Sequence, residues 1–136
     1  MKRIFSIAYP DRAFDLAILI LRAFIGVAMA CHGYGKLIHF AEMQGKFMNF
    51  LGLGPSISLG LVVFAEFFCS ILLLLGFMTR AALIPLIITM VVAVFSAHSG
   101  DIFGKGELAA LYLVAYTSLI LTGPGRYSMD GILSRM

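Results

Sequence analysis

Charged residues are scarce in this chain. Asp, Glu, Lys and Arg make up 12% of its 136 residues, whereas 61% are hydrophobic and the mean hydropathy is +1.01. A soluble globular domain is about one quarter charged and about one half apolar. The composition therefore excludes an ordinary soluble domain and indicates an integral membrane protein. At this length we expect a single membrane domain, residues 1–136.

The chain also lacks any cluster of basic residues and the common catalytic motifs. Its ten Lys and Arg residues are scattered singly, although the formal charge is +3. This distribution excludes a nucleic-acid partner and favours a role of the charges in membrane topology. There is no Cys-x-x-Cys pair, no phosphate-binding loop and no Rossmann fingerprint. We therefore expect no stand-alone catalysis and at most a subunit of an oxidoreductase.

Cysteine is rare as well, with Cys31 and Cys69 both inside apolar runs. If each lies in a membrane helix, their depths differ by about 9 Å at the helical rise of ~1.5 Å per residue. A disulfide requires Cα atoms within about 7 Å. We therefore expect two small core residues and no disulfide.

The apolar runs predict an all-α fold, an antiparallel bundle of four membrane helices. The expected spans cover residues 14–38, 56–75, 80–98 and 107–122, because about 20 helical residues cross the ~30 Å hydrocarbon core. Between the first two spans, apolar residues recur at helical spacing over residues 40–51. This pattern predicts a short amphipathic helix at the membrane interface.

The orientation follows from the basic residues in short loops, which are more frequent on the cytoplasmic side. With an inside N-terminus, six of them are cytoplasmic and three are outside. The inside set is Lys2, Arg3, Arg12, Arg80, Arg126 and Arg135, and the outside set is Lys36, Lys46 and Lys105. We therefore predict that both termini are cytoplasmic.

Arg22 is the anomaly of the first span, because a guanidinium in a membrane must be paired or hydrated. Steps of four and three residues from it define a polar and small stripe of Gly26, Met29, Gly33 and Lys36, which should face other helices. Glu66 is the only charge of the second span and lies at a similar counted depth. We predict a buried Arg22–Glu66 ion pair, which either fixes helix register or forms a functional centre.

A second set of polar residues should meet at the outer ends of the spans. It comprises His32, Lys36, His98 and Glu107, with Tyr112 and Tyr116 on the fourth span. The spacing of the histidines matches no metal-ligand pattern, so no metal is expected. A polar pocket is favoured there, in which His and Lys can bind a quinone carbonyl, and haem is disfavoured. The alternative is that these side chains simply reach interfacial water.

Three stretches resemble the DoxX family, a family of small four-span membrane proteins. They are LRAFIGVAMACHGYGKLIHF, AEFFCSILLLLGFMTRAALIPLIITMVVA and GELAALYLVAYTSLILTGPGRYSMD. The matching positions are Arg22, Gly26, His32, Gly33, Lys36, Glu66, Gly76, Arg80, Glu107, Tyr112, Gly123 and Pro124. The resemblance implies a four-helix bundle in the inner (plasma) membrane of a prokaryote. The family name derives from the small subunit of a thiosulfate:quinone oxidoreductase.

Three hypotheses about function follow. The first is a quinone-linked subunit of a membrane redox complex, in which a protein partner supplies the oxidised or reduced centre. The second is a non-catalytic membrane scaffold or assembly partner, in which the polar residues only lock helix packing. The third is a small solute or proton carrier, acting as a homo-oligomer.

Overall fold

The computed structural model describes residues 3–136 and is helical, with no strand in that range. The all-α fold is thereby confirmed. The helices, with π-helical segments marked η, are α1 (Asp11–Ile38), α2 (Phe40–Met43), α3 (Pro55–Val63), η1 (Phe64–Cys69), α4 (Ser70–Leu75), α5 (Thr79–Val92), η2 (Ala93–Ala97), α6 (Glu107–Thr122) and α7 (Met129–Leu133).

These elements form four rods, of which three are long and apolar enough to cross a membrane: Asp11–Ile38, Pro55–Leu75 and Thr79–Ala97. The second rod joins α3, η1 and α4 without a break. The fourth rod, α6, has 16 residues, or about 24 Å at ~1.5 Å per residue. Its length is less than the usual span, so a crossing by α6 stays a prediction.

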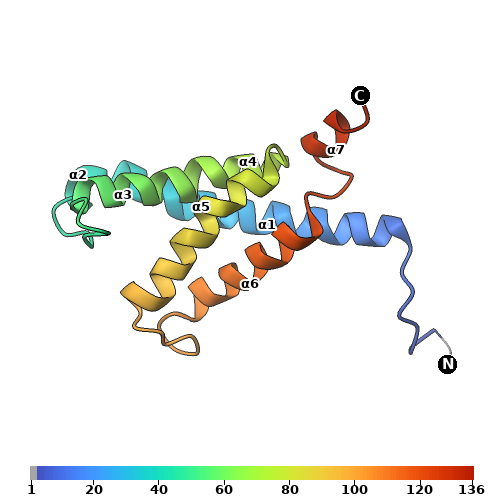
Figure 1. Ribbon diagram of the computed structural model, residues 1–136, viewed down its shortest axis with the longest axis horizontal. Coiled ribbons are helices and arrows are strands. Elements are labelled where there is room, and N and C mark those ends of the chain that lie inside the picture. The colour runs from blue at the N-terminus through green and yellow to red at the C-terminus, as the bar shows by residue number, and fades with distance from the viewer. Residues whose placement is uncertain (1–2) are drawn as a thin grey trace.

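The rods form two pairs that meet at one end of the molecule and diverge at the other (Figure 1). Helix α1 packs along η1 and α4, and α5 packs along α6. The start of α1, the α4–α5 turn, the end of α6 and α7 all gather at one end, which we call the terminal end. The opposite end holds α2, η2 and the start of α6, and we call it the distal end.

The predicted stripe of α1 does face the other helices. Arg22, Gly26, Met29 and Gly33 are all buried. A Cβ atom at Gly33 would lie 2.5 Å from the Phe67 backbone nitrogen, so the absence of a side chain lets α1 and η1 approach closely. On the outer faces of α1 and α6, the apolar side chains of Phe24 and Val114 are 74% and 65% exposed, as expected of a surface that faces lipid.

Two details differ from the sequence-based expectations. Cys69 is buried and both cysteines are free, but Cys31 is exposed, because it lies two residues after Met29 and therefore on the other side of α1. The interfacial helix covers only Phe40–Met43. The chain after it turns back, since the Asn49 side chain accepts a hydrogen bond from the Gly54 amide and Leu51 adopts a positive φ.

The basic residues separate between the two ends as the topology argument requires. Arg12, Arg80, Arg126 and Arg135 line pockets at the terminal end, and Lys36 and Lys105 line a distal one. Lys2, which was counted with the first group, lies outside the described residues. Which end faces the cytoplasm stays a prediction.

Candidate functional site

The centre of the distal half is an ion pair between Lys36 of α1 and Glu66 of η1. The Lys36 Nζ atom lies 2.5 Å from the Glu66 Oε2 atom. The Glu66 side chain is only 6% exposed, whereas that of Lys36 is 27% exposed. Glu66 is therefore a buried charge whose nearest compensation comes from one lysine that also reaches toward the surface.

The expected Arg22–Glu66 pair is wrong. Within the described residues, Arg22 donates hydrogen bonds to the carbonyl oxygens of Pro124 and Tyr127 instead. The cause is an offset of α1 along the bundle axis. This helix begins at Asp11 and extends beyond the other rods at the terminal end. Arg22 and Lys36 are 14 residues apart, or about 21 Å along the helix, so a carboxylate that pairs with Lys36 cannot reach Arg22.

Glu66 occupies a π-helical segment, and η2 is a second one on the facing rod. A π-helical turn inserts extra backbone into a helix, shifts the side chains that follow and occurs frequently at functional sites. The Gly33 contact lies against the Glu66 and Phe67 backbone. The glycine on α1 and the π-turn on the second rod thus together place the Glu66 carboxylate beside Lys36, one helical turn after Gly33.

Two cavities meet at this ion pair. One, of about 440 Å³, is mostly apolar and lies between the second rod, α5 with η2, and the chain segment around Met48. The other, of about 340 Å³, is more polar and is bounded by α1, η2, the loop before α6 and α6 itself. The residues that line both are Lys36, Glu66, Ala93 and His98. Lys36, Glu66 and His98 therefore form a polar boundary between an apolar and a polar compartment.

Most of the residues predicted for a distal pocket do come together. His32, Lys36, His98 and Tyr112 all line the polar cavity, together with Glu66, which was predicted to pair with Arg22 instead. The His32 and Tyr112 rings meet edge to face at 6.3 Å. This convergence was predictable because antiparallel rods bring alternate helix ends to one side.

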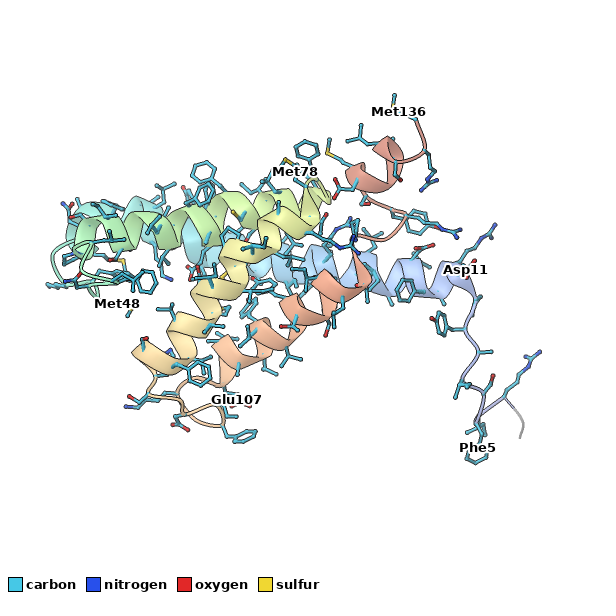
Figure 2. The ribbon with its side chains drawn as sticks, in the orientation of Figure 1. Phe5, Asp11, Met48, Met78, Glu107 and Met136 are labelled. Atoms are coloured by element: carbon cyan, nitrogen blue, oxygen red, sulfur yellow. The ribbon has the colours of Figure 1, made fainter. Side chains whose placement is uncertain are left out.

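Two of the predicted residues lie elsewhere. Tyr116 packs below Tyr112 with the ring centroids 5.8 Å apart, and it is completely buried. Glu107 is exposed at the start of α6 and lines neither cavity, and Figure 2 shows it at the distal end, far from Asp11. Its place at a helix N-terminus makes it a favourable charge there and not a pocket residue.

Sequence reasoning did not find the other residues that line these cavities. Lys105 reaches the polar cavity from the loop before α6, and Phe47, Phe50 and Phe64 line the apolar one. The sequence pattern predicts an interfacial amphipathic helix for the segment that contains Phe47 and Phe50. Their helical spacing gives no sign that residues 47–50 return to the second rod, where the Phe50 amide donates a hydrogen bond to Ser58. Among residues 3–136 no cluster of three metal-ligating side chains occurs.

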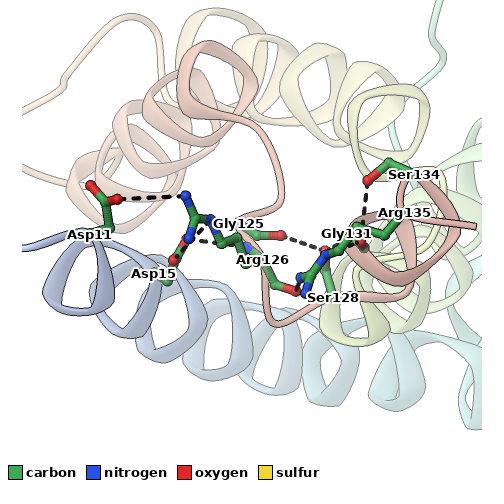
Figure 3. A network of polar contacts seen from close by, with 8 residues as sticks. All are labelled: Asp11, Asp15, Gly125, Arg126, Ser128, Gly131, Ser134 and Arg135. Atoms are coloured by element: carbon green, nitrogen blue, oxygen red, sulfur yellow. Dashed lines mark hydrogen bonds and ion pairs between the residues drawn. The ribbon is translucent and has the colours of Figure 1, made fainter.

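The terminal end holds a second polar network, built by the segment after α6, residues 123–136, which we call the C-terminal segment. Arg126 lies 3.6 Å from both Asp11 and Asp15 of α1, and its amide donates to Asp15 (Figure 3). Asp130 accepts hydrogen bonds from the Met78 and Thr79 amides at the start of α5, at 2.8 and 2.9 Å. The C-terminal segment thus ties α1, the α4–α5 turn and the end of α6 together.

Asp130 makes this network sensitive to pH. Burial raises the pKa of the Asp130 carboxyl, but the amide hydrogen bonds from Thr79 and Met78 and the charge of Arg22 outweigh burial and lower the pKa below its ordinary value. A carboxyl with a lowered pKa in the folded protein adds stability above its ordinary pKa, and that stability is lost as the pH falls through the lowered value.

We therefore expect Asp130→Asn to destabilise the protein at pH 7 by about 1 kcal/mol, because one charged hydrogen-bond acceptor is lost. The difference between variant and wild type should shrink as the pH falls below about pH 4, the ordinary pKa of an aspartate, because the wild-type carboxyl becomes protonated as the pH approaches its lowered pKa. Thermal unfolding of both proteins in detergent from pH 3 to pH 7 measures this. A difference that stays constant over the whole range would contradict the role of the charge.

Comparison with known proteins now places the chain. The DoxX family model matches residues 17–99, which is more than half of the sequence. Inner membrane protein YqjF of Escherichia coli (strain K12) is 31% identical over 128 residues, covering 89% of this chain and 95% of the relative. No solved structure gives a significant match. The family model, the similarity to YqjF over most of both chains and the apolar helices all agree. The chain is therefore a membrane protein that belongs to the DoxX family.

Proposed function

We propose that this protein is a quinone-binding subunit of a membrane redox complex, with the quinone ring held beside Lys36 and Glu66. The observation that supports this most is the apolar cavity of about 440 Å³ that ends at the ion pair and at His98. Small-molecule sites are typically about 300–1,000 Å³, mostly apolar, with a few convergent polar groups. The cavity has both properties.

The residues that line the cavity offer apolar surface along its walls and polar groups at its inner boundary, as a quinone tail and ring would require. Phe47, Phe50 and Phe64 offer aromatic and apolar surface, which suits a ring and a hydrocarbon tail. Lys36 and His98 provide polar groups at the inner boundary, where the ring carbonyls would lie. An amphiphilic ligand with an apolar tail and two carbonyl oxygens is therefore the class of molecule that these residues fit.

Each polar side chain has a separate part in this proposal. A bound quinone supplies reversible two-electron, two-proton chemistry. Lys36 would donate a hydrogen bond to a ring carbonyl, and Glu66 holds the ammonium group in place at 2.5 Å. His98 lines both cavities and can pass a proton between the carbonyl and the polar cavity. The electrons come from a partner chain, since this sequence carries no redox motif of its own.

A short-chain ubiquinone added to the purified protein in detergent is expected to raise its unfolding temperature. A ligand at 100 times its dissociation constant stabilises by about 2.7 kcal/mol. His98→Ala should lose most of this shift, because it removes a polar group from the boundary of both cavities. Thermal unfolding with and without the quinone measures the effect.

His39→Ala is the matched control, because the His39 side chain hydrogen-bonds the Gly35 carbonyl and lines neither cavity. The control should keep the full shift. A shift that is absent in the wild type, or equally small in both variants, would reject quinone binding. In that case a scaffold becomes the better hypothesis, and proton movement into liposomes by the protein alone would favour the carrier.

A further inference from the structure

A second pair of pockets is lined by residues of the α4–α5 turn, the start of α5 and the C-terminal segment. These segments lie at the terminal end, opposite the end that holds α2 and η2 (Figure 1). One, of about 730 Å³, is lined by Arg80, Arg126 and Arg135 together with Asp130. The adjoining one, of about 560 Å³, shares Arg126 and Arg135 and adds the apolar residues Leu75, Met129 and Ile132. Guanidinium groups and apolar side chains thus stand next to each other at the end of the membrane helices.

The charges of these pockets are unbalanced. Four arginines and two aspartates line them, Arg12, Arg80, Arg126, Arg135, Asp15 and Asp130. Both carboxylates already have partners: Asp15 interacts with Arg126, and Asp130 accepts the two amides that begin α5. The helix N-terminus is therefore already capped, and what remains available to a ligand is positive side-chain charge.

Arg80 and Arg135 supply most of that charge. Within residues 3–136 neither has a carboxylate within 4 Å. Arg80 donates from Nε to the Ile120 carbonyl at the end of α6, and Arg135 donates to the carbonyls of Gly131 and Arg126. A guanidinium has five N–H donors in a planar fork that matches the oxygens of a phosphate. These bonds orient both side chains and leave donors for an anion.

We propose that the terminal end binds the phosphate group of an anionic phospholipid between Arg80 and Arg135, with Arg126 beside them. The apolar residues of the adjoining pocket and of α7, where Ile132 is 60% exposed, then contact the acyl chains. Basic pockets at the ends of membrane helices are the recognised form of such sites. The proposed ligand is a lipid and not free phosphate, because the apolar residues beside the arginines suit acyl chains, which free phosphate lacks.

The test is native mass spectrometry of the intact protein in detergent with added phosphatidylglycerol, phosphatidylcholine or inorganic phosphate. The wild type should retain phosphatidylglycerol in preference to phosphatidylcholine. Each basic residue near an anionic lipid strengthens binding by a roughly constant factor. The two arginines together should therefore raise the preference for phosphatidylglycerol about tenfold to thirtyfold. The double variant Arg80→Gln/Arg135→Gln should lose this preference by that factor.

Two controls separate the site from general charge and from damage to the fold. Lys46→Gln/Lys105→Gln removes the same charge away from the terminal pockets and should keep the preference. Arg80→Gln alone, which gives up only one hydrogen bond, to Ile120, should lose part of it with unchanged helical circular dichroism. Equal losses in both double variants, no preference in the wild type, or displacement of the lipid by millimolar inorganic phosphate would each overturn the proposal.

Discussion

Replacing Gly33 by alanine is expected to destabilise the protein by about 3 kcal/mol, at the upper end of the usual cost of overpacking. The added Cβ atom would lie 2.5 Å from the Phe67 nitrogen and 2.6 Å from the Glu66 carbonyl carbon. Both are backbone atoms, so no side-chain rotation relieves the contact, and α1 must move away from η1. Thermal unfolding in detergent measures the loss.

Gly35→Ala is the matched control on the same helix, because a Cβ atom there meets nothing within 4 Å. It should be neutral or stabilise by about 0.5–1 kcal/mol, since glycine is a poor helix former. Gly33→Ala should also weaken quinone-dependent stabilisation, because the displaced backbone belongs to Glu66. Equal stability of the two variants would contradict the close approach of α1 and η1.

The sequence was sufficient to predict a helix at each of the four rods and to identify the buried face of α1. Apolar runs and loop residues give the rods, and the stripe from Arg22 to Gly33 follows from helical spacing. The convergence of His32, Lys36 and His98 follows from antiparallel connection alone. These features depend on local periodicity or on the order of the helices, and both can be inferred from the sequence without knowledge of the packing.

The pairing of the charges was not predictable in the same way. Counting residues from the predicted ends assumes that all helices begin at the same height, but α1 begins well outside the bundle. That offset moves Arg22 to the level of the α4–α5 turn, where a Cβ atom at Gly76 would lie 2.9 Å from its guanidinium carbon. A displacement of α1 by a few helical turns is enough to replace Arg22 by Lys36 as the partner of Glu66.

The contacts of the C-terminal segment could not be predicted for a different reason. Its contacts join Arg126 to Asp15, and Asp130 to Thr79, across 111 and 51 residues of sequence. No periodic pattern in the sequence connects such positions, including those in the short stretch after Gly123-Pro124-Gly125. The one local sign is the Asp11–Asp15 pair, whose spacing of four places two carboxylates on one face of α1.

Lys36→Met is expected to destabilise the protein by about 2 kcal/mol. Removing one partner of a buried ion pair leaves the other charge uncompensated, which costs about 3–5 kcal/mol in a dry interior, and the partial exposure of this pair reduces the cost. Glu66→Gln should cost less than 1 kcal/mol, because Lys36, at 27% exposure, can turn to water, whereas Glu66, at 6%, cannot. We therefore predict that the Lys36 substitution destabilises the protein more than the Glu66 substitution does, although both remove the same contact.

The double variant Lys36→Met/Glu66→Gln completes the cycle and should recover most of the loss, since no unpaired charge remains. Chemical or thermal unfolding of all four proteins under one set of conditions gives the coupling free energy. Recovery of stability without recovery of the quinone-dependent shift would separate the structural part of the ion pair from its part in ligand binding. If Lys36→Met alone were as stable as the wild type, the ion pair would not be what compensates Glu66, and the polar boundary between the two cavities would need another explanation.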